Sequence, residues 1–337
     1  MRKAICIALI SLLATCGAPP AGHVREPVLV AAGGINHFPF AYDLRGSKTL
    51  IAYSTHKDEV VADPVDAARV IGAAGAVSAA NFYLSGVASA LPGLYAASYI
   101  TTAIDEHGER VHGWTSSDNG ATWKPRPGVL HLPEPPIARG AGWGGLLFHR
   151  RLHRIGGRLA GTVYGGYARD QRRDGGEWYR AAWVESDDDG ASWRVRSTIG
   201  EGPAGTEGYA EPVTAICPDG RILAVVRTGP TSPLSWARSA DGGATWSAPR
   251  ELPGMTGWDP DLLALPGGLI MSWGITGAVH VAQSQDCGAS WRHVVDLDIA
   301  TCSGYSGLAL VNGGLMVFTD RNNETEVWGY PVAGALL

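Results

Sequence analysis

The stretch Ser116-Ser117-Asp118-Asn119-Gly120-Ala121-Thr122-Trp123 follows a pattern, Ser-x-Asp-x-Gly-x-Thr/Ser-Trp, that occurs four times in the chain. The other copies run from Ser186 to Trp193, from Ser239 to Trp246 and from Ser284 to Trp291. Because five positions are the same in all four copies, the pattern indicates an internal structural repeat.

Each position of the pattern has a physical role in a hairpin turn. The Asp carboxylate can accept hydrogen bonds from the backbone amides just after it, and the Gly supplies a φ that residues with a Cβ avoid. The Thr or Ser hydroxyl can close the far side of the turn. The Trp is the first large apolar residue of the next strand, where it can pack between neighbouring layers. We therefore interpret the pattern as a folding device without a part in chemistry.

Strand-like runs such as Ser235–Arg238 and Ala278–Ala282 lead into the copies, and other short runs lie upstream of them. Each unit thus indicates about four short antiparallel strands, which is typical of a propeller blade. Residues 28–337 number 310 (337 − 28 + 1), enough for six blades of about 50 residues, and seven also fit. The sequence predicts an all-β, six-bladed β-propeller in which the strand Val28–Ala32 completes the last blade and closes the ring.

The interval of 70 residues between Asp118 and Asp188 (188 − 118) is longer than the 53 and 45 that follow (241 − 188 and 286 − 241). It contains two polar stretches rich in Gly and Arg, residues 150–158 and 167–177. We interpret both as loop insertions.

The composition excludes some classes of protein and partner. Charged residues make up 18% of the chain and apolar residues 45%, which favours a folded domain with a sizeable core. The formal net charge of −5 argues against nucleic acid as a partner, because phosphate binding needs a concentrated Lys/Arg surface. No cysteine or histidine cluster at metal spacing is present, and no motif implies a cofactor.

The first 16 residues have the features of an export signal, with Arg2 and Lys3 before an apolar run that is too short to span a bilayer. Residues 13–17 also resemble a bacterial lipobox, in which Cys16 would be lipidated and anchor the protein to a membrane. Ordinary secretion is the alternative. We therefore expect a signal at residues 1–16, a tether at 17–27 and the propeller at 28–337, in an exported protein that is periplasmic, anchored to the outer membrane, or extracellular.

Three cysteines, Cys217, Cys287 and Cys302, lie in the body of the chain. In an exported protein two of them can pair, and the sequence leaves open which two.

The four repeats resemble the Asp boxes of the sialidase (neuraminidase) superfamily, also called bacterial neuraminidase repeats. Three further stretches resemble active-site segments of that superfamily: residues 211–227, which contain Glu211-Pro212, Asp219-Gly220 and Arg227; Ser303-Gly304-Tyr305-Ser306-Gly307-Leu308; and Ile35–Phe40 with the strand after it. The resemblance implies a six-bladed propeller that binds a glycan.

The resemblance also implies roles for three residues: Tyr305 as nucleophile, Glu211 as acceptor of its proton and Arg227 as ligand of a sugar carboxylate. A neutral phenol avoids the repulsion that a carboxylate nucleophile would meet from an anionic sugar. The planar fork of an arginine suits a carboxylate because it can bind both oxygens.

The sequence departs from the superfamily pattern at two arginines. His37-Phe38-Pro39 stands where the superfamily has Arg-Ile-Pro, and residues 273–278 contain no arginine where another is expected. One guanidinium is a weak clamp for sialic acid, so a uronic or neutral sugar fits as well.

Further candidates complete the predicted site. Asp58 is the candidate acid that protonates the leaving oxygen, with Asp63 as the second choice, and His56 and His37 are alternative acid/base groups or ligands. Arg139 is a candidate anion ligand. Asp259 and Asp261 are candidates for hydrogen bonds to sugar hydroxyls, and Trp258 and Trp143 for stacking on a sugar ring.

The sequence thus predicts an exported, exo-acting glycoside hydrolase. Two alternatives stay open: a propeller polysaccharide lyase acting on uronic-acid glycans, in which His and Tyr would move protons, and a non-catalytic glycan-binding propeller.

Overall fold

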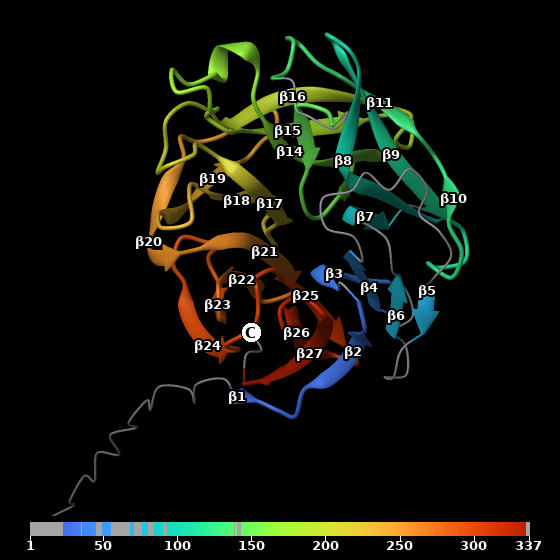
Figure 1. Ribbon diagram of the computed structural model, residues 1–337, viewed down its shortest axis with the longest axis vertical. Helices are drawn as coiled ribbons and strands as arrows, with labels where there is room; N and C mark the ends of the chain where they lie inside the picture. The colour runs from blue at the N-terminus through green and yellow to red at the C-terminus, as the bar shows by residue number, and fades with distance from the viewer. Residues whose placement is uncertain are drawn as a thin grey trace, which may run out of the picture.

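The structure is a computed structural model that describes residues 23–34, 36–44, 49–54, 68–70, 76–79, 84–89, 93–137, 139 and 143–334. In this part of the chain the strands form six blades that follow one another around a central hub, as the colour order in Figure 1 shows. The predicted all-β, six-bladed propeller is confirmed. The one described helical element is the short 3-10 helix η2 (Ala168–Asp170).

The first strand of each blade lies at the hub. Blade 1 consists of β3 (His37–Asp43), β4 (Thr49–Ser54), β6 (Ala76–Ala79) and β5 (Ala68–Val70). Blade 2 consists of β7 (Leu84–Ser89), β8 (Leu94–Asp105), β9 (Gly108–Ser116), β10 (Lys124–Pro125) and β11 (Gly128–His131). Blade 3 consists of β12 (Leu146–Phe148), β13 (His153–Ile155), β14 (Arg158–Gly165), β15 (Arg180–Ser186) and β16 (Ser192–Gly200). The outer strands β11 and β16 pair in parallel and join blades 2 and 3.

The remaining blades follow the same order. Blade 4 consists of β17 (Ala210–Ile216), β18 (Ile222–Arg227), β19 (Pro233–Ser239) and β20 (Arg250–Thr256). Blade 5 consists of β21 (Trp258–Leu265), β22 (Gly268–Ile275), β23 (Ala278–Ser284) and β24 (Arg292–Asp298). Blade 6 consists of β25 (Ser306–Val311), β26 (Gly314–Arg321), β27 (Glu326–Ala333), β1 (His23–Val24) and β2 (Val28–Ala32).

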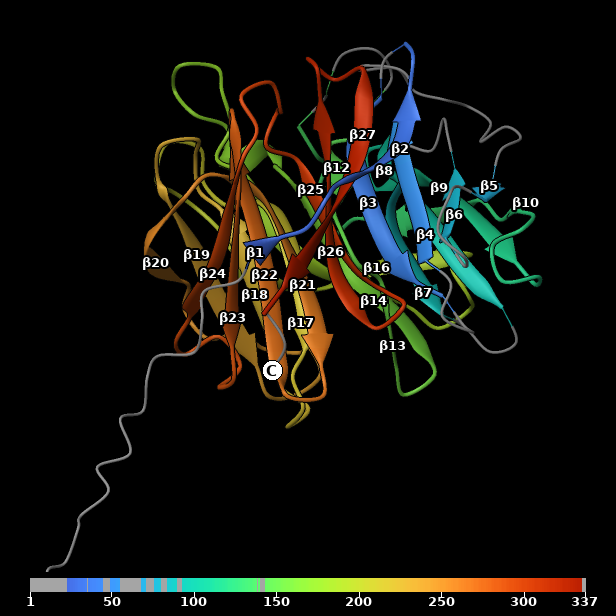
Figure 2. The ribbon, with the colours of Figure 1, turned by 90° about the horizontal axis from the view of Figure 1, so that it is seen from below.

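The two ends of the chain close the ring in blade 6. The N-terminal strand β2 pairs antiparallel with the C-terminal strand β27, as predicted, and Figures 1 and 2 both show the two side by side. The short strand β1 also pairs with β27, so the sheet begins at His23 rather than at Val28, inside the segment predicted as a tether.

Residues 1–22 lie outside the described residues, and with them the predicted export signal and Cys16. No helix in the described part of the chain combines the length and the apolar character that a membrane crossing requires.

Each junction between neighbouring blades contains its own apolar core. Phe40 and Leu50 of blade 1 pack with Leu94 of blade 2, and the same arrangement continues around the ring to the junction of blades 6 and 1. There Phe318 of blade 6 packs with Ile51 of blade 1. Burial of these faces stabilises the ring as a whole, because each blade lends one face to each neighbour.

The four Asp boxes have the predicted geometry. In the first box the Asp118 carboxylate accepts hydrogen bonds from the Thr122 amide and the Ser116 hydroxyl, both at 2.8 Å, and Gly120 has a φ of 85°. The other three boxes repeat these contacts. Each box Trp packs in the junction with the preceding blade, and Trp193 is fully buried there. The predicted packing of the Trp between neighbouring layers is confirmed.

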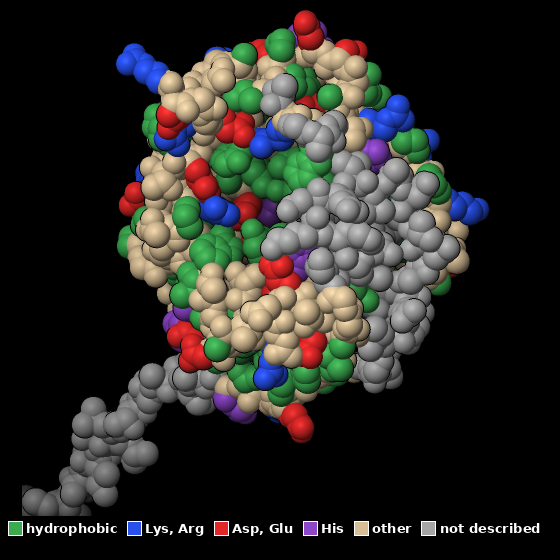
Figure 3. Space-filling model, viewed as in Figure 1, with side chains coloured by type: hydrophobic (Ala, Val, Ile, Leu, Met, Phe, Trp, Pro, Cys, Tyr) green, Lys and Arg blue, Asp and Glu red, His purple; other side chains and the backbone are tan. Residues whose placement is uncertain are grey.

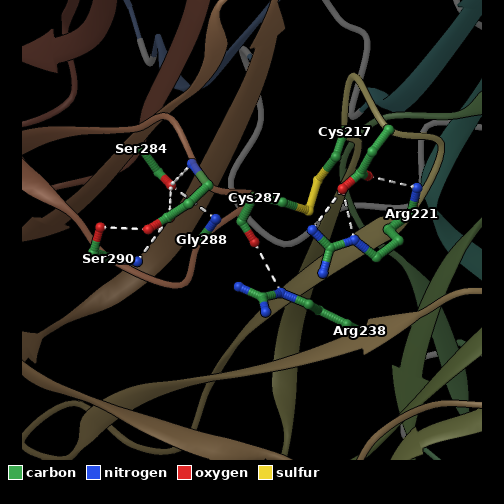
Figure 4. Close-up of a disulfide and its surroundings, with 9 residues drawn as sticks. Cys217, Arg221, Arg238, Ser284, Cys287, Gly288 and Ser290 are labelled. Atoms are coloured by element: carbon green, nitrogen blue, oxygen red, sulfur yellow. Dashed lines mark hydrogen bonds and ion pairs between the residues drawn. A yellow bond between two sulfur atoms is a disulfide. The ribbon is translucent and has the colours of Figure 1, made fainter.

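A buried disulfide links two neighbouring blades. Cys217, in the turn after β17 of blade 4, is bonded to Cys287, which lies inside the Asp box of blade 5 (Figure 4). Cys302 is the buried free cysteine of the described residues. Asp219 lies close enough to the two sulfurs to form a metal-binding group with them, but the disulfide leaves no thiolate to serve as a ligand.

Candidate functional site

Three inner strands begin with the same backbone irregularity. Phe38, Glu211 and Asp259 each precede a proline and have a positive φ, of 49°, 45° and 50°. The strand register shifts at each of these positions. A positive φ is rare and costly for residues with a Cβ, and such irregularities are held in place at functional sites. Here they turn three side chains toward one pocket at the hub.

We call this cavity the hub pocket. Its volume is about 30 Å³, and each of the six blades contributes at least one side chain to its wall. The lining residues are Phe38 and Phe40 of blade 1, Tyr99 of blade 2, His149 of blade 3, Glu211 of blade 4, Asp259 of blade 5 and Tyr305 just before blade 6. Figure 3 shows acidic, basic and histidine side chains near the centre of this face.

Tyr305 lies in the pocket wall with its ring held edge-on to Phe38, at 4.2 Å between ring centroids. The Thr319 hydroxyl donates to the Tyr305 carbonyl at 2.8 Å, which fixes the backbone. Burial raises the pKa of Tyr305 well above 10, the charges of Glu211 and Asp259 raise it further, and Arg227 opposes them. The phenol is therefore neutral near pH 7.

Glu211 and Arg227 form a partly buried ion pair beside the pocket. The Arg227 guanidinium donates to Glu211 at 2.8 Å and to Glu207 at 3.1 Å. The other Glu211 oxygen accepts the Asp259 amide at 2.8 Å. Burial alone would lower the pKa of Arg227, but the charges of Glu211 and Glu207 raise it instead. The pair holds the Glu211 carboxylate at the pocket wall.

A second set of ion pairs fills the hub beneath the pocket, and we call it the hub plug. Arg150 and Arg151 follow β12 and have φ values of 38° and 39°. The Arg150 Nε donates to Asp259 at 3.1 Å, and Arg151 binds Asp261 with two hydrogen bonds of 2.7 Å. The Arg150 guanidinium also lies over the Phe40 ring, at 4.6 Å from its centre. Blade 3 thus reaches blades 1 and 5 through two arginines.

Asp259 is the central acceptor of the plug, and its side chain is 1% exposed. Besides Arg150 it contacts His149, at 3.2 Å, and accepts the Ser306 amide at 3.1 Å. Burial alone would raise the pKa of Asp259, but the Arg150 charge and the His149 contact hold it below its usual value. Its proposed hydrogen bonds to sugar hydroxyls stay a prediction.

The other predicted residues lie at different depths around the hub. His37 is fully buried, with its ring against Phe38 at 3.9 Å. Trp258 donates from its indole to the Ser303 carbonyl at 3.1 Å, so it supports the segment that carries Tyr305. Arg139 binds Glu177 at 2.6 Å and lies over the Tyr179 ring.

His56, Asp58 and Asp63 lie outside the described residues. Their roles as acid/base groups or ligands stay predictions.

Sequence reasoning missed His149, Arg150 and Arg151, because the arginines were assigned to a loop insertion. It also missed Asp320, which is buried and accepts hydrogen bonds from the Ser303 amide at 3.0 Å and from its hydroxyl at 2.6 Å. Burial raises the pKa of Asp320 to about 6, against the lowering effect of these bonds. The sequence did offer one further signal: Phe38, Glu211 and Asp259 each precede a proline, and this shared pattern marks the three strand starts that line the pocket.

Six blades, four Asp boxes and a polar pocket at the hub define an Asp-box β-propeller. Residues 95–317 match the BNR repeat-like domain family, and the chain belongs to that family. The predicted resemblance to the sialidase superfamily is thereby confirmed at the level of family and fold. A search of curated protein sequences gives no match.

Two solved structures share the fold over nearly the whole chain at low sequence identity. A protein of unknown function from Dyadobacter fermentans is 14% identical, with a TM-score of 0.66 over 93% of this chain and 99% of that one. An α-L-arabinanase from Penicillium chrysogenum, solved with arabinobiose, is 14% identical, with a TM-score of 0.62 over 92% and 98%. The NanB sialidase from Streptococcus pneumoniae is 20% identical, with a TM-score of 0.47 over 66% of this chain and 35% of that one.

Proposed function

We propose that this chain is an exo-acting glycoside hydrolase whose active site is the hub pocket. The observation that carries the proposal is that Tyr305 and Glu211 line one pocket, with Arg227 bound to Glu211. A phenol and a carboxylate at one cavity supply a nucleophile and an acceptor for its proton.

The reaction follows from these groups in two steps. The Tyr305 oxygen attacks the anomeric carbon while Glu211 takes the phenol proton, and the bond to the leaving oxygen breaks as an acid protonates that oxygen. We propose Asp58 for the acid. Water then attacks the anomeric carbon and gives a proton to the Asp58 carboxylate, while the bond to Tyr305 breaks and the phenolate takes its proton back from Glu211. The neutral ground state of Tyr305 suits this sequence, since a proton acceptor is needed only as the phenolate forms.

The hub plug supports exo cleavage over cleavage within a chain. Arg150 and Arg151 cross the hub below the pocket, so a sugar that enters it meets a wall of ion pairs. A site with such a floor favours binding of the end of a glycan chain. The arabinanase of similar fold is consistent with a glycan substrate, although its likeness is one of fold alone.

We also propose that the protein is exported, with Cys16 as a candidate lipid anchor. The disulfide between Cys217 and Cys287 supports this proposal, because such bonds persist in oxidising compartments.

The test is hydrolysis of a panel of glycans and aryl glycosides by the wild type and by Tyr305→Phe. We expect the variant to lose at least about 1000-fold in kcat with an unchanged Tm. The matched control is Tyr209→Phe, a phenol between blades 3 and 4, which should keep full activity.

Three outcomes contradict the proposal. Full activity of Tyr305→Phe contradicts the role of Tyr305 as nucleophile. Unsaturated products that absorb ultraviolet light indicate the lyase. Glycan binding without turnover, unchanged in Tyr305→Phe, indicates the non-catalytic binding propeller.

A further inference from the structure

The arginines at the hub are all engaged by carboxylates of the protein itself. Arg150 binds Asp259 and Arg151 binds Asp261 in the hub plug. Arg139 and Arg227 are more exposed, at 19% and 18% of their side chains, and are the two that a ligand could approach most easily. Their partners therefore decide what kind of ligand the pocket accepts.

Both terminal nitrogens of the Arg227 fork already bind carboxylates. One terminal nitrogen donates to Glu211 at 2.8 Å, and the other donates to Glu207 at 3.1 Å. A sugar carboxylate needs such a fork with two free donors for bidentate binding. A sugar carboxylate that binds Arg227 would therefore lie close to Glu211 and Glu207, and both would repel it.

Arg139 is in a similar position farther from the pocket. One terminal nitrogen donates to Glu177 at 2.6 Å, and Nε donates to the Gly145 carbonyl at 3.3 Å. Its guanidinium also lies 5.5 Å from the centre of the Tyr179 ring. The protein thus uses this arginine as a structural cation.

The charges at the hub sum to a negative value. Four arginines face five carboxylates in the described part of the chain, which gives 4 − 5 = −1. The arginines are Arg139, Arg150, Arg151 and Arg227, and the carboxylates are Glu177, Glu207, Glu211, Asp259 and Asp261. Two of the carboxylates, Glu211 and Asp259, line the pocket itself.

The remaining pocket wall suits an uncharged sugar. Phe38 and Tyr99 contribute aromatic rings to the wall, on which the C–H face of a sugar can pack. The carboxylates of the wall can accept hydrogen bonds from sugar hydroxyls, whereas they repel a second carboxylate at close range.

We propose that the sugar that binds over the hub pocket is neutral, such as a pentose or hexose without a carboxylate, rather than a sialic or uronic acid. This inference rests on the proposed function, whose pocket it describes, and it names the substrate class of that pocket.

The test uses matched pairs of 4-nitrophenyl glycosides that differ only in the carboxylate. The pairs are galactoside with galacturonide and glucoside with glucuronide, each as both anomers, together with an α-L-arabinofuranoside and an N-acetylneuraminide. For the neutral member of the cleaved pair we expect a kcat/KM at least about 100-fold above that of its acidic partner, since close like charges disfavour binding strongly. An acidic partner that is cleaved equally well or better overturns the inference and leaves the proposed hydrolase intact.

A variant at Glu207 sharpens the test. Glu207→Gln frees one prong of Arg227 from its charged partner, so the preference for the neutral sugar should fall about tenfold. The matched control is Glu251→Gln, which removes the same charge from an exposed position on the outer strand β20 and should leave the preference unchanged. An unchanged preference in Glu207→Gln contradicts the role assigned to the paired arginine.

Binding separates failure of this inference from failure of the proposed function. If no glycoside of the panel is hydrolysed, the proposed function fails, and calorimetry with methyl galactoside and methyl galacturonide still tests the charge argument. Tighter binding of the galactoside supports the inference. Tighter binding of the galacturonide, or binding of neither, overturns it.

Discussion

The rim and the hub of this propeller hold aspartates in opposite ways. At the rim, the bonds of an Asp box join residues two to four positions apart, as between Asp118 and Ser116 or Thr122. At the hub, Asp259 binds groups 47 and 109 residues away, in Ser306 and Arg150. The rim is therefore assembled one turn at a time, whereas the hub exists only when several blades have come together.

The two environments also act differently on the carboxylates. The exposed Asp118 has its pKa lowered to about 2, chiefly by the hydroxyl and amide of Thr122. The buried Asp259 depends on Arg150 to offset the cost of leaving water. Loss of a partner should therefore cost little at the rim and much at the hub.

The largest effect is expected from Arg150→Met. The substitution leaves Asp259 buried without its main partner, so the free energy of unfolding should fall by about 3 to 5 kcal/mol. Urea denaturation measures it, and Arg172→Met, at the more exposed pair with Asp174, serves as the control with little change. Equal effects in the two variants contradict the distinction between hub and rim.

The disulfide between blades 4 and 5 should matter almost as much. It closes a loop of 70 residues, so reduction should lower the free energy of unfolding by about 2 to 4 kcal/mol. Denaturation with and without dithiothreitol measures this loss. The double variant Cys217→Ser/Cys287→Ser should show no response to the reductant, and a response there assigns the effect to another site.

The folding stability of the protein should depend on pH through the buried Asp320. Because its pKa is raised to about 6 in the folded state, the folded protein binds a proton that the unfolded chain releases near pH 4. Stability should therefore fall as pH rises from about 4 to 6, by about 1 to 3 kcal/mol relative to Asp320→Asn. Thermal unfolding of both proteins across this range measures the difference, and parallel curves contradict it.

The smallest effect is expected at a single Asp box. Asp286→Ala removes bonds to Ser284 and Ser290 at an exposed turn, which should cost about 1 kcal/mol, with Asp298→Ala as the control. Since the pKa of Asp286 is lowered to about 2, its contribution is complete above about pH 4 and is lost as pH falls toward 2. A loss as large as that of Arg150→Met removes the contrast between rim and hub.

The rim could be predicted from the sequence because its bonds are local. The spacing of Ser116, Asp118, Gly120 and Trp123 fixed both the turn and its core anchor, and strand Val28–Ala32 was correctly placed in the last blade. The positive φ of the fourth box residue, 59° at Asn119 and 57° at Cys287, was not anticipated. The residue type there varies, so no pattern marks it.

The hub could be predicted only in part. Resemblance selected Tyr305 and Glu211, which line one pocket, and Arg227, which contacts Glu211. Arg150 and Arg151 were missed because their stretch was assigned to a loop insertion, where arginines are usually solvated, and their carboxylates lie 109 and 110 residues away. Partners at that separation follow from the ring and not from local spacing.

The pairing of the N-terminal strand β2 with the C-terminal strand β27 in blade 6 sets the order in which the propeller can fold. Ala32 pairs with Glu326, which the ribosome adds 294 residues later (326 − 32). Blades 2 to 5 can form from neighbouring segments as they emerge, but the ring stays open until the final strand arrives. A chain that stops before β27 would leave a gap in the ring, with unpaired strand edges on β2 and β26 at its two sides. Premature termination should therefore produce an aggregation-prone intermediate rather than a smaller propeller.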